Sequence, residues 1–277
     1  MHEIINTQKG TNNTQIGEQN NCTENNNTEV HVETHYNTYI GASLEEVTTI
    51  VTNLFLDNFP RMQKVAKDAA EARINELWEN IVKELPRKDV KNLLPFMEVD
   101  VQYVLYEAQK GYARFATKDL LSNLSSLIIE RVKHNEDDLC LRVAIDKAIS
   151  VVPMLSQEHL DYLSLMFISK FVKVPGIENI QKLKELLDYL DDTFFYSSDP
   201  IVHLNNLGCL QLALGDSWEI LSNAYGINQM EIKEICPDKI KKLHSDYNTS
   251  YVGTILAIVN AERKTKYRFN PKIWIHD

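Results

Sequence analysis

The sequence lacks the marks of a secreted or membrane-spanning chain. No apolar stretch follows Met1, and no run approaches the roughly 20 apolar residues that a membrane helix needs. The longest apolar runs, LSSLIIERV and VGTILAIV, are interrupted by polar residues. We therefore expect a soluble cytoplasmic protein that has no membrane partner.

Cysteine and glycine are scarce. None of the 4 cysteines belongs to a C-x-x-C pair, and Cys140 and Cys209 lie among leucines, which indicates buried structural thiols rather than disulfides. With only 9 glycines, the chain contains neither the G-x-x-x-x-G-K-[ST] nor the G-x-G-x-x-G phosphate-binding loop. The motifs H-E-x-x-H and G-x-S-x-G are absent as well. We expect no cofactor.

Positive charge is in deficit. The chain has 29 lysines and arginines against 39 aspartates and glutamates, a formal net charge of -10. Such a chain does not attract phosphate backbones by its overall field, so nucleic acid is not an expected partner. The segment KIKKLHSDY forms a small basic patch, but three lysines on an exposed helix are commonplace. Its basic residues are Lys239, Lys241, Lys242 and His244.

A helical pattern runs from residue 43 to about residue 262. Ser43 and Glu46 match a capping box at its start, and Thr117 and Ser156 are expected to cap later helices. Apolar residues recur at spacings of three and four in one segment after another. No repeat of 20 to 50 residues is evident, which argues against a solenoid. The sequence therefore predicts a mainly α protein.

Prolines and glycines divide this pattern, and we place a boundary between two helical units at residues 173–176. The predicted organisation is an Asn/Thr-rich β-forming segment over 1–41, a helical bundle over 43–173, and a smaller C-terminal helical unit over 177–277. Within the last unit, IVHLNNLGCLQLAL is expected to be helical. The closing TKYRFNPKIWIHD is expected to form a short aromatic tail with β character.

The first 41 residues are rich in Asn and Thr and poor in large aliphatic side chains. Two Asn-Thr-Gln triplets are followed by Gly10 and Gly17, seven residues apart, and residues 29–40 alternate between two faces as a strand does. One interpretation is a disordered leader that ends in a docking strand. The other is that copies from several chains pair edge to edge and bury their apolar rows jointly. The oligomer contacts would then be Ile16, Val30, Val32, Tyr36 and Ile40.

The histidines give little sign of chemistry. His31 and His35 would stand about 13 Å apart on a strand, which is too far for one metal ion. His159 and His203 lie among apolar residues, as satisfied buried histidines do. Cys209 is six residues from His203, on a different face of a helix, which argues against a Cys–His dyad. We expect neither a metal site nor a catalytic residue.

Carboxylates gather in the segment HNEDDLC, at Glu136, Asp137 and Asp138. They could ligate a hard cation, but the spacing is not that of a calcium loop. A solvated turn that caps the next helix is the interpretation we favour.

Two residues near the end of the chain suggest packing roles. Gly253 lies inside an apolar helical segment, where a glycine marks a close approach between backbones. Trp274 lies between two isoleucines and is expected to dock the tail on the helical body.

Several short motifs resemble those of a family of uncharacterised bacterial proteins. Those proteins combine an Asn-rich leader similar to NNTQIG with a helical body and a T-x-x-G helix near the end. The matching residues are Gly17, Gly208, Cys209, Gly253 and Trp274. The segment SYVG, residues 250–253, stands where that family has a Leu-Thr-x-x-Gly pattern. The tail is also similar to that of abortive-infection proteins, which are linked with defence against phage. The resemblance implies no catalytic residues.

Together these features favour a non-enzymatic, homo-oligomeric interaction protein of the bacterial cytoplasm, acting as a sensor or adaptor in phage defence. Two alternatives stay open. One is a metal-dependent enzyme that uses dispersed carboxylates such as Asp188, Asp191 and Asp192, whose spacing groups them on one helix face. The other is a phage-derived structural protein whose leader forms part of a fibre.

Overall fold

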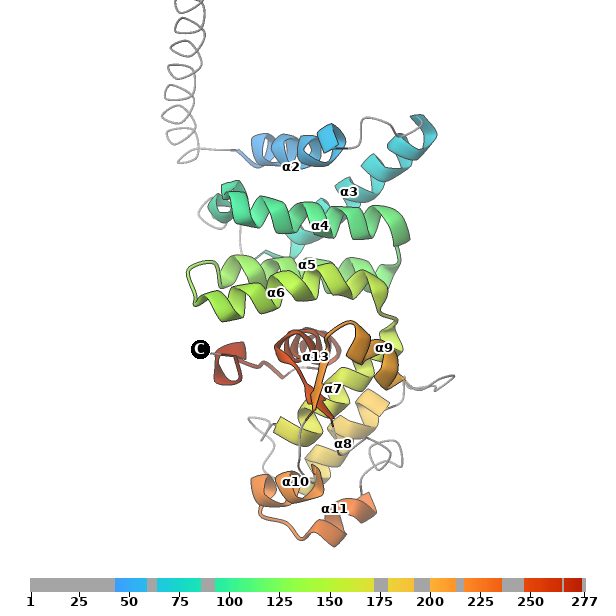
Figure 1. Ribbon diagram of the computed structural model, residues 1–277, viewed down its shortest axis with the longest axis vertical. Coiled ribbons are helices and arrows are strands. Elements are labelled where there is room, and N and C mark those ends of the chain that lie inside the picture. The colour runs from blue at the N-terminus through green and yellow to red at the C-terminus, as the bar shows by residue number, and fades with distance from the viewer. Residues whose placement is uncertain are drawn as a thin grey trace, which may run out of the picture.

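The protein is mainly α-helical, as the sequence predicts. The computed structural model describes residues 43–58, 64–85, 93–171, 179–191, 200–212, 217–235, 247–265 and 267–275. The helices stack along the long axis of the molecule (Figure 1). In that view α2 lies at one end, α4, α5 and α6 follow, α13 and α7 come next, and α10 and α11 lie at the other end.

The first half of the described chain consists of helices and two short 3-10 turns. Two 3-10 turns, η2 and η3, each contain a proline in their first turn, Pro95 and Pro153. The elements are α2 (Leu44–Asn58), α3 (Lys64–Glu84), η2 (Leu94–Met97), α4 (Val99–Phe115), α5 (Lys118–Lys133), α6 (Leu139–Val151), η3 (Val152–Met154) and α7 (Gln157–Phe171).

The second half adds shorter helices and one small sheet. Its elements are α8 (Ile180–Asp191), α9 (Pro200–Asn206), β1 (Leu210–Leu212), α10 (Ser217–Tyr225), α11 (Gln229–Ile235), β2 (Tyr247–Thr249), α13 (Tyr251–Lys264) and η4 (Pro271–Ile273). Strands β1 and β2 pair antiparallel, with Leu210 opposite Thr249. In Figure 1 α13 is seen nearly end-on, so it runs across the direction of α5 and α6.

The helix starts follow from local capping chemistry. The Ser43 amide donates to the Glu46 carboxylate at 2.8 Å, and the Glu46 amide donates to Ser43 Oγ at 3.2 Å, which completes the predicted capping box. Thr117 accepts from the Leu120 amide and caps α5. Ser250 accepts from the Gly253 amide and caps α13 in the same way. These caps fix where the helices begin.

Two local predictions in the second half are wrong. The segment IVHLNNLGCLQLAL is not one helix: α9 ends at Asn206, Gly208 adopts a φ of 71°, and residues 210–212 form β1. Gly208 tolerates this left-handed backbone because it has no Cβ, and the chain can therefore turn out of the helix. Within the described part of the tail, residues 267–275, a 3-10 turn occurs and no strand is found.

The apolar core is continuous from the first described helix to the tail. One cluster of buried residues includes Val47 of α2, Leu163 of α7, Ala257 of α13 and Ile275 near the end of the chain. Helix α13 packs along α7 and against α6. Helix α7 is buried on all sides from Leu160 to Lys170, as expected of a central helix. The predicted boundary at residues 173–176 lies outside the described residues.

Gly253 and Trp274 lie at contacts that hold α13 and the tail. A Cβ on Gly253 would overlap the carbonyl oxygen of Cys209, which accepts a hydrogen bond from the Ser250 amide at 2.9 Å. The Trp274 ring meets Phe167 of α7 edge-on, with 4.9 Å between ring centroids. The leader residues assigned to oligomer contacts, Ile16, Val30, Val32, Tyr36 and Ile40, lie outside the described residues.

Candidate functional site

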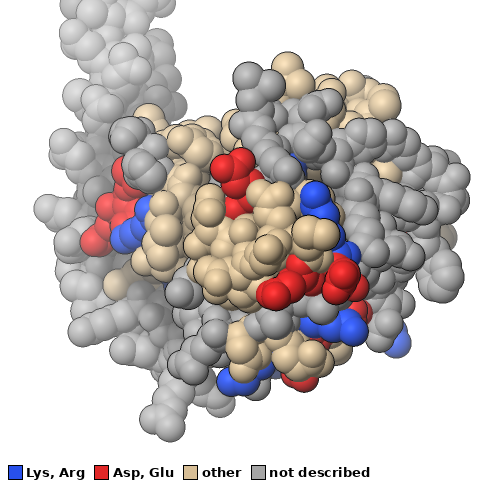
Figure 2. Space-filling model, turned by 90° about the horizontal axis from the view of Figure 1, so that it is seen from below, with Lys and Arg blue, Asp and Glu red and all other residues tan. Residues whose placement is uncertain are grey.

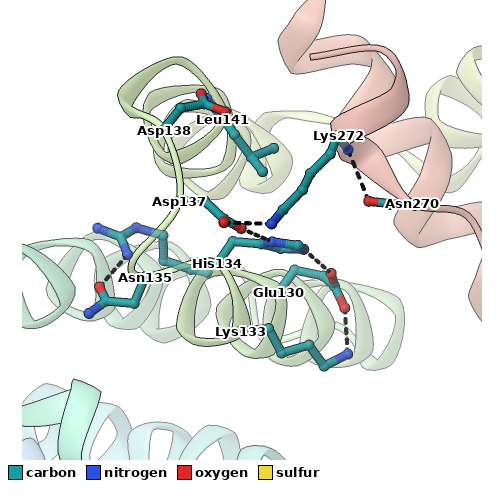
Figure 3. Close-up of polar contacts among 10 residues, drawn as sticks. Glu130, Lys133, His134, Asn135, Asp137, Asp138, Leu141, Asn270 and Lys272 are labelled. Atoms are coloured by element: carbon teal, nitrogen blue, oxygen red, sulfur yellow. Dashed lines mark hydrogen bonds and ion pairs between the residues drawn. The ribbon is translucent and has the colours of Figure 1, made fainter. Parts of the chain in front are cut away.

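The acidic turn HNEDDLC joins α5 to α6 and holds the C-terminal tail (Figure 3). His134 lies between two carboxylates: its Nδ1 contacts Asp137, and its Nε2 is 3.4 Å from Glu130. Asp137 also accepts from Lys272 Nζ at 2.6 Å, and Glu130 accepts from Lys133 Nζ at 2.6 Å. The turn therefore clamps η4 onto the α5–α6 hairpin.

The charges of this clamp satisfy one another. Glu130 raises the pKa of His134 by accepting its hydrogen bond, and Asp137 adds to the effect against the opposing influence of burial. Burial raises the pKa of Glu130, but hydrogen bonds from His134 and Lys133 outweigh it and lower the pKa. Lys272 and His134 likewise lower the pKa of Asp137. An ionised, fully paired cluster is typical of a structural contact.

A metal role for this turn has no support among the described residues. The Asp138 side chain accepts from the Leu141 amide at 2.8 Å and caps α6, as the sequence suggested. In the ranges that the structure describes, no group of three or more His, Cys, Asp and Glu side chains could hold a metal ion.

A second ionic network centres on Arg131 of α5. The Arg131 side chain is only 2% exposed, and it donates to Asp100 and Asp146, each at 2.6 Å, and to Asn135 at 2.7 Å. Burial acts to raise the pKa of Asp100, but the hydrogen bond and charge of Arg131 outweigh it and lower that pKa. Arg142 extends the network, 3.6 Å from Asp100. Helices α4, α5 and α6 are thereby joined through one guanidinium group.

A third network joins α7 to α13. Asp161 is fully buried and lies 2.6 Å from Lys264 Nζ. Its carboxylate also accepts from Asn260 and Gln157, each at 2.9 Å. Ser164 completes the group by accepting from Asn260 and donating to the Ala257 carbonyl. This network holds the two most closely packed helices of the body in register.

Among the histidine and cysteine candidates, His159 and Cys140 are partly buried and His203 is exposed, so the predicted buried position is confirmed in full only for Cys209. The rings of His159 and His203 lie 4.8 Å apart, and His203 Nε2 contacts the Met154 carbonyl at 2.9 Å. Burial, with a contribution from His203, lowers the pKa of His159, so its ring favours the neutral form. Burial raises the pKa of the Cys209 thiol to about 12, which disfavours the thiolate needed for nucleophilic attack.

The remaining candidates fall partly outside the described residues. Asp188 is half-buried on α8, whereas the side chains of Asp191 and Asp192 are not among those described. His31 and His35 lie outside the described residues, as do Lys239, Lys241, Lys242 and His244. On the face shown in Figure 2, acidic and basic side chains lie side by side, and the described part of that face carries no extended basic stripe.

Large apolar side chains are exposed at the starts of α4 and α6. Val99 is 85% exposed and Tyr103 67% on α4; Leu139 is 64% exposed and Val143 54% on α6. Each pair is four residues apart and so shares one helix face. We call these four residues the α4–α6 patch. Exposed apolar patches on a soluble protein often mark interaction surfaces.

An ion pair lies between the two halves of the α4–α6 patch. Helices α4 and α6 pack directly on each other. Asp100, between Val99 and Tyr103 in sequence, lies 3.6 Å from Arg142, which immediately precedes Val143. The side chains of Asp100 and Arg142 are 44% and 31% exposed. The surface therefore combines exposed apolar side chains with accessible charges of both signs.

Comparison with known proteins identifies a family without identifying an activity. A protein-family model whose description reads only "-like" matches residues 41–248. The chain belongs to that family. None of the curated proteins and none of the solved structures matches the chain. The family match covers the α4–α6 patch and all three ionic networks except the residues of α13 and η4.

Sequence reasoning missed most of these residues. Arg131 was detectable as a charge between Ile128 and Val132 on an otherwise apolar helix face. Val99 and Tyr103 were detectable as apolar residues off the stripe that faces the core. Asp161 gave no such signal, because its partners Asn260 and Lys264 lie about a hundred residues away in α13. None of the described helices is long and apolar enough to cross a membrane.

Proposed function

We propose that the chain is a non-enzymatic, homo-oligomeric interaction protein whose helical body contacts a second copy through the α4–α6 patch. The observation that carries this proposal is the exposure of four large apolar side chains on two adjoining helices. An interface that buried these side chains would gain about 25 cal/mol of hydrophobic free energy for each Å² of apolar area removed from water. The ionic networks of the body, in contrast, consist of charges that satisfy one another.

A second copy is the occupant that fits the patch best. In a two-fold symmetric contact the same surface meets itself, so every charge must find its opposite within that surface. Asp100 and Arg142 meet this condition, because Asp100 of one copy can face Arg142 of the other. The leader, with its strand-like alternation, is proposed as an additional oligomer contact.

The biological setting is proposed as bacterial defence against phage, with the protein acting as a sensor or adaptor. The resemblance of the tail to abortive-infection proteins supports this role. The body is consistent with an adaptor, since its described titratable clusters are used for packing. A test is to express the chain in a phage-sensitive bacterial host and count plaques. Fewer plaques are expected with the natural chain than with an empty vector, and equal numbers would contradict the defence role.

Light scattering after size exclusion tests the assembly. The natural chain is expected to give a mass that is a multiple of 31.9 kDa. The double variant Tyr103→Lys/Val143→Lys is expected to give a smaller mass, because it adds like charges to the centre of the contact. The control Val202→Lys/Met230→Lys introduces the same charges at exposed apolar positions outside the α4–α6 patch and should keep the natural mass.

Removal of residues 1–41 separates the two proposed contacts. Loss of assembly on this truncation alone would assign the oligomer to the leader and not to the α4–α6 patch. A natural chain of 31.9 kDa at every concentration would contradict the homo-oligomeric proposal.

A further inference from the structure

A groove lies between α3, α4 and η3, on residues that the α4–α6 patch does not use. Its main hollow has a volume of about 630 Å³. The small residues Ala66, Ala69 and Ala70 line it from α3, and Gly111 and Ala113 line it from α4. Short side chains allow another backbone to approach, because the distance between packed helices depends on the side chains at their contact.

One wall of the groove is a helix face that other described elements leave open. The first six residues of α3, 64–69, are all exposed, and Val65 is 82% exposed. The opposite wall is fixed, because a Cβ on Gly111 would overlap Cγ of Pro153 in η3. Gly111 thus permits the tight contact between α4 and η3 that shapes this side. The groove is formed by regular elements and needs no rearrangement to exist.

The groove is elongated. A second hollow, of about 400 Å³, shares Phe115, Pro153 and Met154 with the first and continues toward Thr117 and Gln157. Phe115 and Met154 are about half exposed where the two hollows meet. An elongated groove with half-exposed apolar side chains suits a peptide segment better than a compact ligand. Amphipathic helices bind such grooves through apolar residues spaced three and four apart.

The rim of the main hollow is basic in an otherwise acidic chain. Arg73, Lys110 and Arg114 line it against one carboxylate, Glu107, which pairs with Lys110 at 2.6 Å. Arg73 uses Nη1 to donate to the Ala113 carbonyl at 2.5 Å, and the Arg114 guanidinium lies 4.8 Å from the Phe115 ring centroid. Both guanidinium groups lie at the groove, and a guanidinium group has five N–H donors with which it can bind an anion.

We propose that this groove binds an acidic amphipathic helix of a partner protein. The apolar face of that helix covers Phe115 and Met154, and its carboxylates meet Arg73 and Arg114. The inference rests on the proposed function, since an adaptor needs a surface for a partner besides the surface for its own copies. The groove supplies this second surface without competing for the α4–α6 patch.

A displayed peptide library tests the proposal with the full chain. Each 15-residue member carries leucines at positions 1, 4, 8 and 11. Each of the remaining positions carries Glu, Gln or Lys. Selection against the natural chain is expected to enrich Glu over Lys at least tenfold at the positions beside the leucines. The enriched peptides, synthesised and labelled, are then titrated with the chain by fluorescence anisotropy.

Two variants locate the binding and one matched control calibrates it. The variant Ala69→Glu fills the groove at an exposed position of α3. The variant Arg114→Glu reverses a charge on the rim. We expect each of them to weaken peptide binding at least tenfold. Lys67→Glu makes the same change of charge on α3 at a residue that does not line the groove, and should change the Kd less than threefold.

Several outcomes would overturn the proposal. These are no enrichment, enrichment of Lys over Glu, or equal weakening by Lys67→Glu and Arg114→Glu. Binding of dodecanoate with no selectable peptide would assign the groove to a small amphipathic anion instead. Failure here is distinguishable from failure of the homo-oligomer, because the mass measured by light scattering depends on Tyr103 and Val143 and not on Ala69 or Arg114.

Discussion

At the scale of the residue, Asp161 is a charge whose burial depends on its partners. It is completely buried, and Lys264, Asn260 and Gln157 provide its stabilisation. The substitution Asp161→Ala removes the carboxylate that lies 2.6 Å from the largely buried Lys264 ammonium, so we expect a loss of about 3–5 kcal/mol in the free energy of unfolding, measured in urea. Glu79→Ala breaks an exposed pair and should cost under about 1 kcal/mol. Equal losses would contradict the structural role of Asp161.

His134 makes stability depend on pH in a defined direction. Its pKa in the folded state is raised, mainly by Glu130. The protonated ring therefore contributes stability that is fully present below the unfolded pKa of about 6.5 and is lost as the pH rises through the folded pKa. His159 acts in the opposite sense, because burial lowers its pKa. A comparison that removes His134 alone is thus required.

The comparison uses His134→Gln and urea unfolding across the pH range 6 to 8. The natural chain should be more stable than the variant at the lower pH, and this difference should shrink as the pH rises. The contribution of His159 is present in both proteins and cancels. A difference that stays constant across this range would show that His134 contributes only its packing.

The residues that could be predicted from the sequence are those whose partners are local. The capping pair Ser43 and Glu46 and the helix cap at Asp138 depend on neighbours three residues away. Asp137 was singled out from its acidic surroundings, but its pairing with Lys272 spans 135 residues and has no local signature. The same limit applies to the contact of Asp161 with Asn260 and to that of Arg131 with Asp100.

At the scale of the element, apolar periodicity predicted the helices because most of them bury one face in the apolar core. The strands were missed because they are only three residues long, and β1 pairs with β2 across 35 or more residues of chain. Pairing of this kind is decided by the tertiary fold and not by local preference. The groove also escaped prediction, since its walls come from α3, α4 and η3 and its shape depends on how they pack.

Gly253 tests how closely the small sheet approaches α13. In an ordinary helix interior, Gly→Ala stabilises by about 1 kcal/mol. Here the new methyl group would overlap the Cys209 carbonyl, a backbone atom that cannot rotate away. We expect Gly253→Ala to lower the free energy of unfolding by about 1–3 kcal/mol instead. Urea unfolding measures the sign, and a gain in stability would show that the sheet can move away from α13 at little cost.

At the scale of the whole molecule, the continuous core links the two helical units that the sequence suggested. Helix α13 belongs to the C-terminal unit by sequence, but it packs along α7 and against α6 of the bundle. The buried cluster that contains Val47 of α2 also contains Ile275. A unit whose principal helix packs inside its neighbour loses much of its own core when that neighbour unfolds. We therefore expect the described body to unfold cooperatively.

Two tryptophans report on this cooperativity from opposite parts of the core. Trp78 of α3 packs edge-on against Phe96, with 5.2 Å between ring centroids, and Trp274 packs against Phe167. Trp218→Phe/Trp274→Phe leaves Trp78 as the reporter, and Trp78→Phe/Trp218→Phe leaves Trp274. In each variant the urea midpoint of the fluorescence should coincide with that of the helical circular dichroism. Separate midpoints within one variant would show that the C-terminal unit unfolds independently, and that the contact of α13 with α6 and α7 is too weak to couple it to the bundle.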